Sequence, residues 1–110
     1  MKLQAHEVAL EMVVAMRPLV AAIVKHDRSL ADQLKRAASS VTLTLGEGTY
    51  SRHGNQTARF QEALASANES RSALRLAAAW GYLSLDQTRA ADHLLDRLIA
   101  MTWRLTHPRV

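Results

Sequence analysis

Histidine, serine and carboxylate side chains are the groups in this chain that could do chemistry, but their spacing matches no catalytic or metal-binding pattern. A di-metal site in a helical bundle uses a Glu-x-x-His pair on each of two helices, and the sequence contains no such pair. Ser39, Ser40 and Ser66 have no His or Asp at a supporting spacing, so capping or packing explains them. There is no Cys to serve as nucleophile or ligand. We therefore expect no enzymatic activity, no metal and no cofactor.

Basic side chains give the one indication of a ligand. The formal net charge is +4, and residues 35–75 hold more basic than acidic residues. The candidate nucleic-acid-binding residues are Lys35, Arg36, Arg52, Arg59 and Arg75. Such a cluster would bind a phosphate backbone in a salt-dependent way, and with only 5% aromatic residues we do not expect base stacking. The alternative is that these are ordinary solvated surface side chains.

Four helices would have to position these residues. Little Gly or Pro and abundant Ala, Leu and Val favour helices over strands, and apolar residues recur at helical spacing. We predict one domain over residues 1–110, with helices at about 3–26, 29–50, 56–80 and 85–106, as an all-α, antiparallel up-down-up-down four-helix bundle. The predicted inward rows are Val8, Met12, Ala15, Leu19 and Ile23; Leu30, Leu34, Ala38, Val41 and Leu45; Phe60, Leu64, Ala67, Arg71, Leu74 and Ala78; and Ala91, Leu94, Leu95, Leu98, Met101 and Leu105.

Local signals place the helix ends. Pro18 lies inside the first apolar pattern, which keeps its phase, so we prefer one kinked helix to two short ones. Ser29 is predicted to cap the second helix. Residues 51–55 form a short polar loop, and Gly81 ends the third helix. Ser84 with Gln87 forms a capping box for the fourth helix.

The second helix carries a mixed face opposite its core row. At 100° per residue, Arg36, Ser40, Leu43, Glu47 and Tyr50 share that face. Because a buried helix with a second mixed face usually needs a second neighbour, we interpret this face as an interface between copies of the chain. Glu47 would then meet Arg36, or another basic residue, of a neighbouring copy. The alternative is two solvated charges at opposite ends of one face.

Arg71 falls on the predicted core row of the third helix, where an arginine must be paired. One interpretation places it at the edge of the bundle with its stem packed and its charged head in water. The other directs it across an oligomer interface or into a central channel. We include it among the candidate interface residues.

Several segments resemble a known family. They are Arg36-Ala37-Ala38 followed by Ser40-Val41 and Glu47-Gly48, then Ala63-Leu64-Ala65-Ser66-Ala67-Asn68-Glu69, then Gly81-Tyr82-Leu83. Together they are similar to the bacterial four-helix bundle proteins first noticed in intervening sequences of 23S ribosomal RNA genes, a family that includes accessory proteins of diversity-generating retroelements. The resemblance covers about three quarters of the chain. It departs at Thr44-Leu45-Gly46 and in a shorter loop before the third helix. The resemblance implies a homopentamer with a central channel.

These observations predict a non-enzymatic, oligomeric adaptor that binds RNA or DNA through its backbone, beside a nucleic-acid-processing partner such as a reverse transcriptase. Five copies would carry a charge of about +20, enough to hold a polyanion. The alternative is a structural protein–protein scaffold in which the positive charge is incidental. Because the first thirty residues have neither a signal-peptide core nor a long apolar span, we expect a soluble, cytoplasmic protein.

Overall fold

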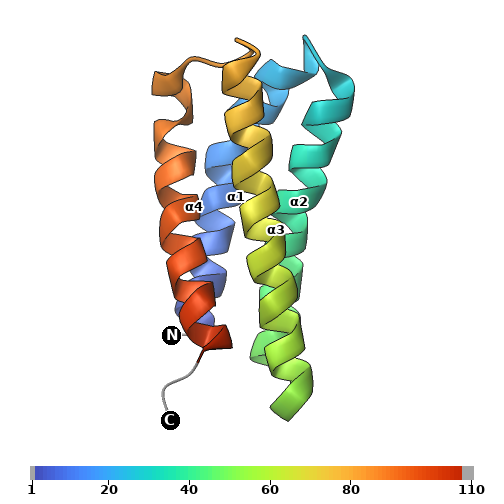
Figure 1. The fold of residues 1–110 in the computed structure, drawn as a ribbon, viewed down its shortest axis with the longest axis vertical. Helices are drawn as coiled ribbons and strands as arrows, with labels where there is room; N and C mark the ends of the chain where they lie inside the picture. The colour runs from blue at the N-terminus through green and yellow to red at the C-terminus, as the bar shows by residue number, and fades with distance from the viewer. Residues whose placement is uncertain (1, 108–110) are drawn as a thin grey trace.

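Four helices make up the part of the chain that the computed structural model describes, which is residues 2–107 without the side chain of His53. They are α1 (Lys2–Val24), α2 (Arg28–Thr49), α3 (His53–Ala79) and α4 (Leu85–Thr106). Short connections join them, so consecutive helices run antiparallel (Figure 1). The start of α1 and the end of α4 therefore lie at one end of the molecule, together with the α2–α3 connection.

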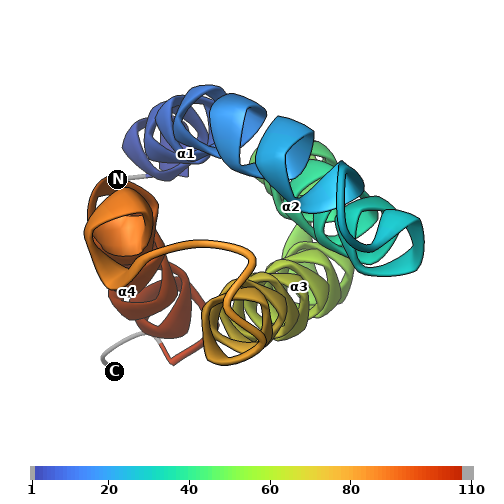
Figure 2. The same ribbon diagram turned by 90° about the horizontal axis from the view of Figure 1, so that it is seen from above.

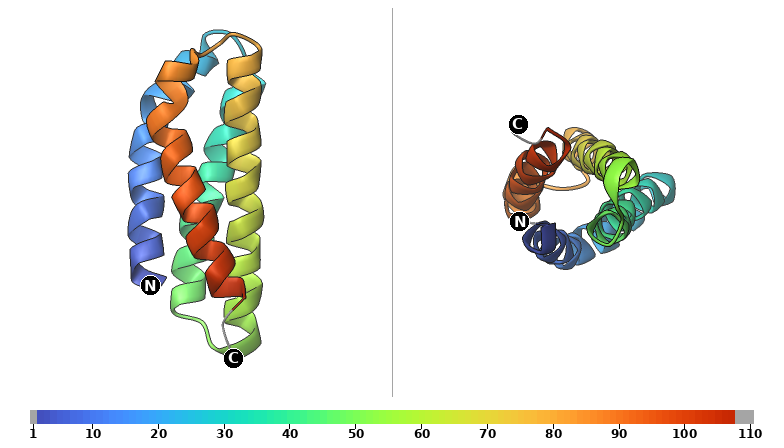
Figure 3. Two further views of the ribbon diagram at one scale, coloured as in Figure 1. Left: turned by 60° about the vertical axis from the view of Figure 1, so that its left-hand side comes forward. Right: turned by 90° about the horizontal axis from the view of Figure 1, so that it is seen from below.

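The helices form a closed ring seen end-on (Figure 2). Each helix packs against two neighbours, in the order α1, α2, α3, α4 and back to α1. The bundle is elongated, measuring 44 × 22 × 19 Å, and two further views show the same antiparallel order (Figure 3). The predicted all-α, up-down-up-down four-helix bundle is confirmed.

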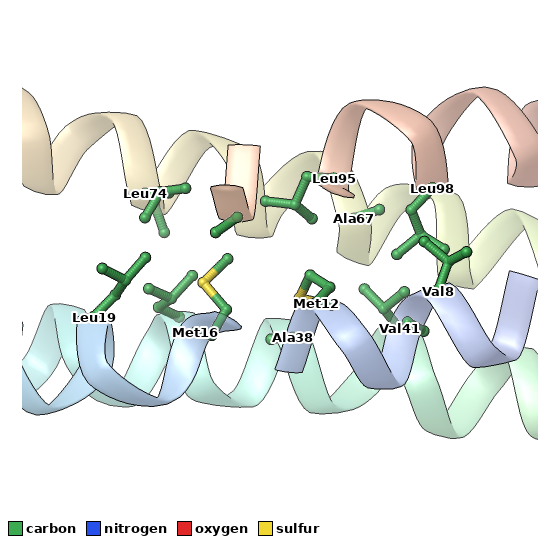
Figure 4. Close-up of a cluster of buried hydrophobic side chains, with 14 of the residues drawn as sticks. Val8, Met12, Met16, Leu19, Ala38, Val41, Ala67, Leu74, Leu95 and Leu98 are labelled. Atoms are coloured by element: carbon green, nitrogen blue, oxygen red, sulfur yellow. The ribbon is translucent and has the colours of Figure 1, made fainter. Parts of the chain in front are cut away.

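The core runs along the centre of the ring, where side chains from all four helices meet (Figure 4). The predicted row of α2 is fully confirmed, since Leu30, Leu34, Ala38, Val41 and Leu45 are all buried. In α1, Met16 occupies the place expected for Ala15, which is only partly buried. Burying these side chains is the main term that stabilises the bundle, with about 1.5–3 kcal/mol for each Val, Leu, Ile or Met.

The core row of α3 agrees with the predicted one at Phe60, Ala67 and Leu74 and lies one residue earlier at the other three positions. Its buried line is Phe60, Ala63, Ala67, Ser70, Leu74 and Ala77, whereas Leu64, Arg71 and Ala78 are only partly buried. Small residues on this line let neighbouring helices approach closely. Ser70 is tolerated in the core because its hydroxyl donates a hydrogen bond of 2.8 Å to the carbonyl of Ser66.

Two helix starts differ from the prediction. Asp27, not Ser29, caps α2, because its Oδ1 accepts a hydrogen bond of 2.9 Å from the backbone N–H of Leu30. Helix α3 begins at His53, so residues 53–55 are helical rather than loop. Two further predictions are confirmed: α1 continues as one helix through Pro18, and Ser84 and Gln87 form a capping box.

Candidate assembly and nucleic-acid surfaces

The outer face of α2 gathers the residues that the sequence assigns to an interface. Leu43 is 66% exposed and Tyr50 83% exposed, so large apolar groups stand on this face without cover. A hollow of about 550 Å³ lies along it, lined by Asp32, Lys35, Arg36, Ser39, Ser40, Leu43, Thr44 and Glu47. Ser40 forms one wall and accepts a hydrogen bond of 2.9 Å from Ser66 of α3. The predicted row is therefore a continuous, outward-facing surface.

Glu47 finds a basic partner within its own chain. Its Oε2 lies 3.2 Å from Nε of Arg59 on α3, and Nη1 of Arg59 lies 3.0 Å from Oε1 of Glu62. Pairing with Arg36 of a neighbouring copy is therefore not needed to balance the Glu47 carboxylate. Two carboxylates also surround the Arg59 guanidinium, which weakens the attraction of this predicted nucleic-acid-binding residue for phosphate.

Arg71 likewise pairs inside the chain, across the α3–α4 contact. Its Nε lies 3.2 Å from Oδ1 of Asp92, and its Nη1 lies 3.3 Å from Oδ1 of Asp96. The hydrogen bond to Asp92 is the main reason that the pKa of Arg71 is raised. Arg71 thus sits at the edge of the bundle, as one interpretation proposed, but with its head held by carboxylates. Arg75 shares the same Asp92 at 3.6 Å, so its charge is also partly balanced.

Lys35, Arg36 and Arg52 differ from the other predicted basic residues. Within residues 2–107 none of these three has a carboxylate within ion-pair distance, and all are exposed. Lys35 and Arg36 lie together on α2, whereas Arg52 follows the end of that helix, about 20 Å further along the axis. The five predicted residues therefore form no single patch, and the pair on α2 is the strongest candidate for binding phosphate.

An apolar stripe on the outer face of α1 escaped the sequence analysis. Leu3, Leu10 and Val14 lie opposite the core row of α1 and are 61%, 47% and 59% exposed. Their spacing of seven and four residues was a readable signal, but the stronger core row of the same helix obscured it. The stripe means that α1 is apolar on two faces, as expected for a helix that contacts more than its own bundle.

Two apolar hollows lie where α1 and α2 meet. One, of about 350 Å³, lies between α1 and α2 and is lined mainly by Val13, Met16, Val20 and Ala38, with Arg17 and Lys35 at its border. The other, of about 250 Å³, lies toward the end where α1 begins and is lined by Leu3, His6, Leu43, Gly46 and Tyr50 among others. The outer surface of α1 and α2 is thus apolar, indented and flanked by cations.

The groups that could do chemistry remain scattered. Among the described side chains no three His, Asp or Glu residues lie close enough together to hold a metal ion. His6 lies against α2, His26 follows α1, His93 stands exposed on α4, and His107 stacks on Trp103 at 4.1 Å. Within the same described range, none of the helices is long and apolar enough to cross a lipid bilayer.

The fold and surfaces define a small antiparallel four-helix bundle whose outer faces combine apolar hollows with unpaired cations. Comparison with known proteins gives the family. A family model described as 23S rRNA-intervening sequence protein matches residues 1–104, and the chain belongs to this family. No curated protein matches the chain.

A solved structure supports the same fold. It is the crystal structure, at 1.70 Å resolution, of a protein of unknown function from the S23 ribosomal protein family of Bacteroides thetaiotaomicron VPI-5482. The similarity covers 93% of this chain and 97% of that chain, with a TM-score of 0.85 and 17% sequence identity. At this identity the likeness concerns the fold alone.

Proposed function

We propose that this protein is a non-enzymatic, self-associating adaptor that binds RNA or DNA through the phosphate backbone. The observation that carries the proposal is the outer surface of α1 and α2, where exposed apolar side chains adjoin the unpaired cations Lys35 and Arg36. Apolar surface of this kind marks a protein–protein contact. Joining copies through it would repeat the two cations around the assembly and increase the local positive potential.

Self-association is the first part of the proposal. A homopentamer with a central channel is the assembly that the family resemblance implies. Its apolar contacts would come from Leu43, Tyr50 and the α1 stripe. At the border of this contact between copies would lie Arg36 and Ser40. Arg71 and Glu47 contribute less, because intrachain partners already balance their charges.

Solution mass tests this first part. Leu43→Glu places a charge on the proposed contact and should reduce the mass measured by sedimentation at micromolar concentration. Leu85→Glu is the matched control, because Leu85 is 78% exposed but lies at the start of α4, outside the α1–α2 surface. Both changes lie on the surface and should leave the fold intact, which circular dichroism would verify. A wild-type mass retained in Leu43→Glu would contradict the proposed contact.

Nucleic-acid binding is the second part, and salt dependence tests it. We expect the assembly to bind mixed RNA or DNA at about 50 mM salt and to release it steeply by about 200 mM, as counterion release requires. Arg36→Gln should weaken binding more than Arg97→Gln, which removes the same charge from α4. Equal effects of the two variants would contradict a role for the α2 cations. A reverse transcriptase, or another nucleic-acid-processing protein, is the partner that the resemblance suggests beside the nucleic acid.

A structural protein–protein scaffold is the second candidate function. It is favoured by the ion pairs of Arg59, Arg71 and Arg75, because a basic side chain that is held by a carboxylate is less available to bind phosphate. A scaffold would self-associate in the same way but would retain no nucleic acid even at about 50 mM salt.

A further inference from the structure

Three aromatic rings meet at the end of the bundle that carries both the α1–α2 and the α3–α4 connections (Figure 2). The rings of His26 and Tyr82 stack with their centroids 5.2 Å apart and their planes 4° from parallel. Trp80 and Tyr82 are 6.5 Å apart at 19°. These residues come from segments more than fifty positions apart in the sequence. The fold brings these rings together, and no sequence pattern indicates the cluster. For this reason the sequence, with only 5% aromatic residues, did not predict base stacking.

Backbone geometry holds this cluster in place. Gly81 ends α3 in the left-handed region, with φ of 82°, which other residues adopt at a cost. The N–H of Tyr82 then donates to the carbonyl of Ala77 at 2.9 Å, and the N–H of Gly81 donates to that of Ala78 at 3.0 Å. This pair of bonds is the Schellman motif, and it fixes the direction in which Tyr82 leaves the helix.

A side-chain contact joins the two connections. The Tyr82 hydroxyl donates to Oδ2 of Asp27 at 3.3 Å, while Oδ1 of the same carboxylate caps α2. Both oxygens of Asp27 are therefore engaged in holding the structure. The rings are thus positioned before any ligand arrives, which reduces the entropy that binding would cost.

Exposure and charge at this end indicate a ligand. Trp80 is 66% exposed, although an indole ring is one of the largest apolar groups a protein can bury. Leu83, three residues later, is buried and anchors the connection instead. Lys25 and Arg28 flank His26 and Asp27, are exposed, and have no carboxylate within ion-pair distance in residues 2–107. Parallel rings beside free cations match a nucleobase with its phosphates better than an apolar peptide.

We propose that Trp80, Tyr82 and His26 form a stacking surface for an unpaired base of single-stranded nucleic acid, with Lys25 and Arg28 contacting the neighbouring phosphates. This inference rests on the proposed nucleic-acid function and adds a preference for single strands. A base within a duplex is already stacked on its neighbours, so a duplex could offer the rings only its ends.

Binding of a fluorescently labelled 20-nucleotide oligo-dT at about 50 mM salt tests the stacking surface. Trp80→Ala should raise Kd by at least about 5-fold, the lower bound for losing one base–aromatic stack, whereas Trp80→Phe should retain most of the affinity. Trp103→Ala is the matched control, because Trp103 is also exposed and also stacks on a histidine, but near the opposite end of the bundle. Binding to a duplex should change little in all three variants.

Intrinsic fluorescence gives a second readout. The chain has 2 Trp residues, so Trp103→Phe leaves Trp80 as the single indole, whose emission should be quenched when oligo-dT binds. Equal affinities of Trp80→Ala and Trp103→Ala, with wild-type salt dependence, would overturn the stacking surface and leave the proposed function standing. Absence of binding to either nucleic acid at about 50 mM salt would overturn both. Circular dichroism of Trp80→Ala would confirm that the exposed change leaves the fold intact.

Discussion

Gly48 offers a sharp test of how α2 and α3 pack to form the outer surface. In an ordinary helix, Gly→Ala stabilises the protein by up to about 1 kcal/mol. At Gly48, however, an added Cβ would lie 2.6 Å from Cε1 and 2.8 Å from Cδ1 of Phe60, and 3.2 Å from Cβ of Arg59. Phe60 is buried in the core, so its ring cannot move aside cheaply. Overpacking of this kind costs about 1–3 kcal/mol, which exceeds the gain in helix propensity.

We therefore expect Gly48→Ala to lower the free energy of unfolding by about 1–2 kcal/mol, measured by urea denaturation at equal chain concentration. Gly46→Ala is the control within the same helix. A Cβ there would meet only the His6 ring at 3.5 Å, an ordinary contact, so this variant should be stabilised by up to about 1 kcal/mol. If Gly48→Ala proved as stable as the wild type, the close α2–α3 contact described here would be wrong.

Three further substitutions test other parts of the structure. Thr102→Val should raise the free energy of unfolding by about 1 kcal/mol in urea denaturation, because the buried Thr102 hydroxyl has no hydrogen-bond partner among the described residues; a loss of stability would contradict this. Asp92→Asn should lower the free energy of unfolding by about 1 kcal/mol, because it removes a negative charge that pairs with Arg71. Asp86→Asn, in an exposed pair with Arg89, should lower it by less than about 0.5 kcal/mol. Equal decreases in the two variants would refute the difference. Partial burial and the Asp27 carboxylate raise the pKa of the Tyr82 phenol above its ordinary value. The Tyr82 phenol therefore loses its proton at a lower pH in the unfolded chain than in the folded one, so the free energy of unfolding should fall as the pH rises above about 10. Tyr82→Phe should reduce that fall, as measured by denaturation curves across about pH 9–11.

Regular apolar spacing made the bundle predictable. In α2, large side chains such as Leu34, Val41 and Leu45 recur at one phase, so only one face could be the core. In α3, alanines occupy several faces, and the phase of the row rests on Phe60 and Leu74. Such a sequence fits two adjacent rows almost equally well. Packing against the neighbouring helices selected the row with Ser70 over the row with Arg71.

On the candidate surfaces, the sequence predicted which residues share a helix face, but it could not predict the contacts between distant segments. The mixed face of α2 follows from helical geometry alone, and the structure places its residues on one outer surface. The ion pairs of Glu47 with Arg59 and of Arg71 with Asp92 depend on which helix faces which, and no local pattern specifies them. Asp27 illustrates the same limit, since its second oxygen is held by Tyr82 from the far connection.

Sedimentation equilibrium of the purified wild-type chain, at micromolar concentration and about 50 mM salt, tests most directly whether the outer surface of α1 and α2 joins copies of this protein. A homopentamer would have a mass of about 60 kDa, five times that of the 12.2 kDa chain. A single species of 12.2 kDa would contradict the self-associating adaptor, because the apolar stripe and the α2 face would then remain exposed in the working protein.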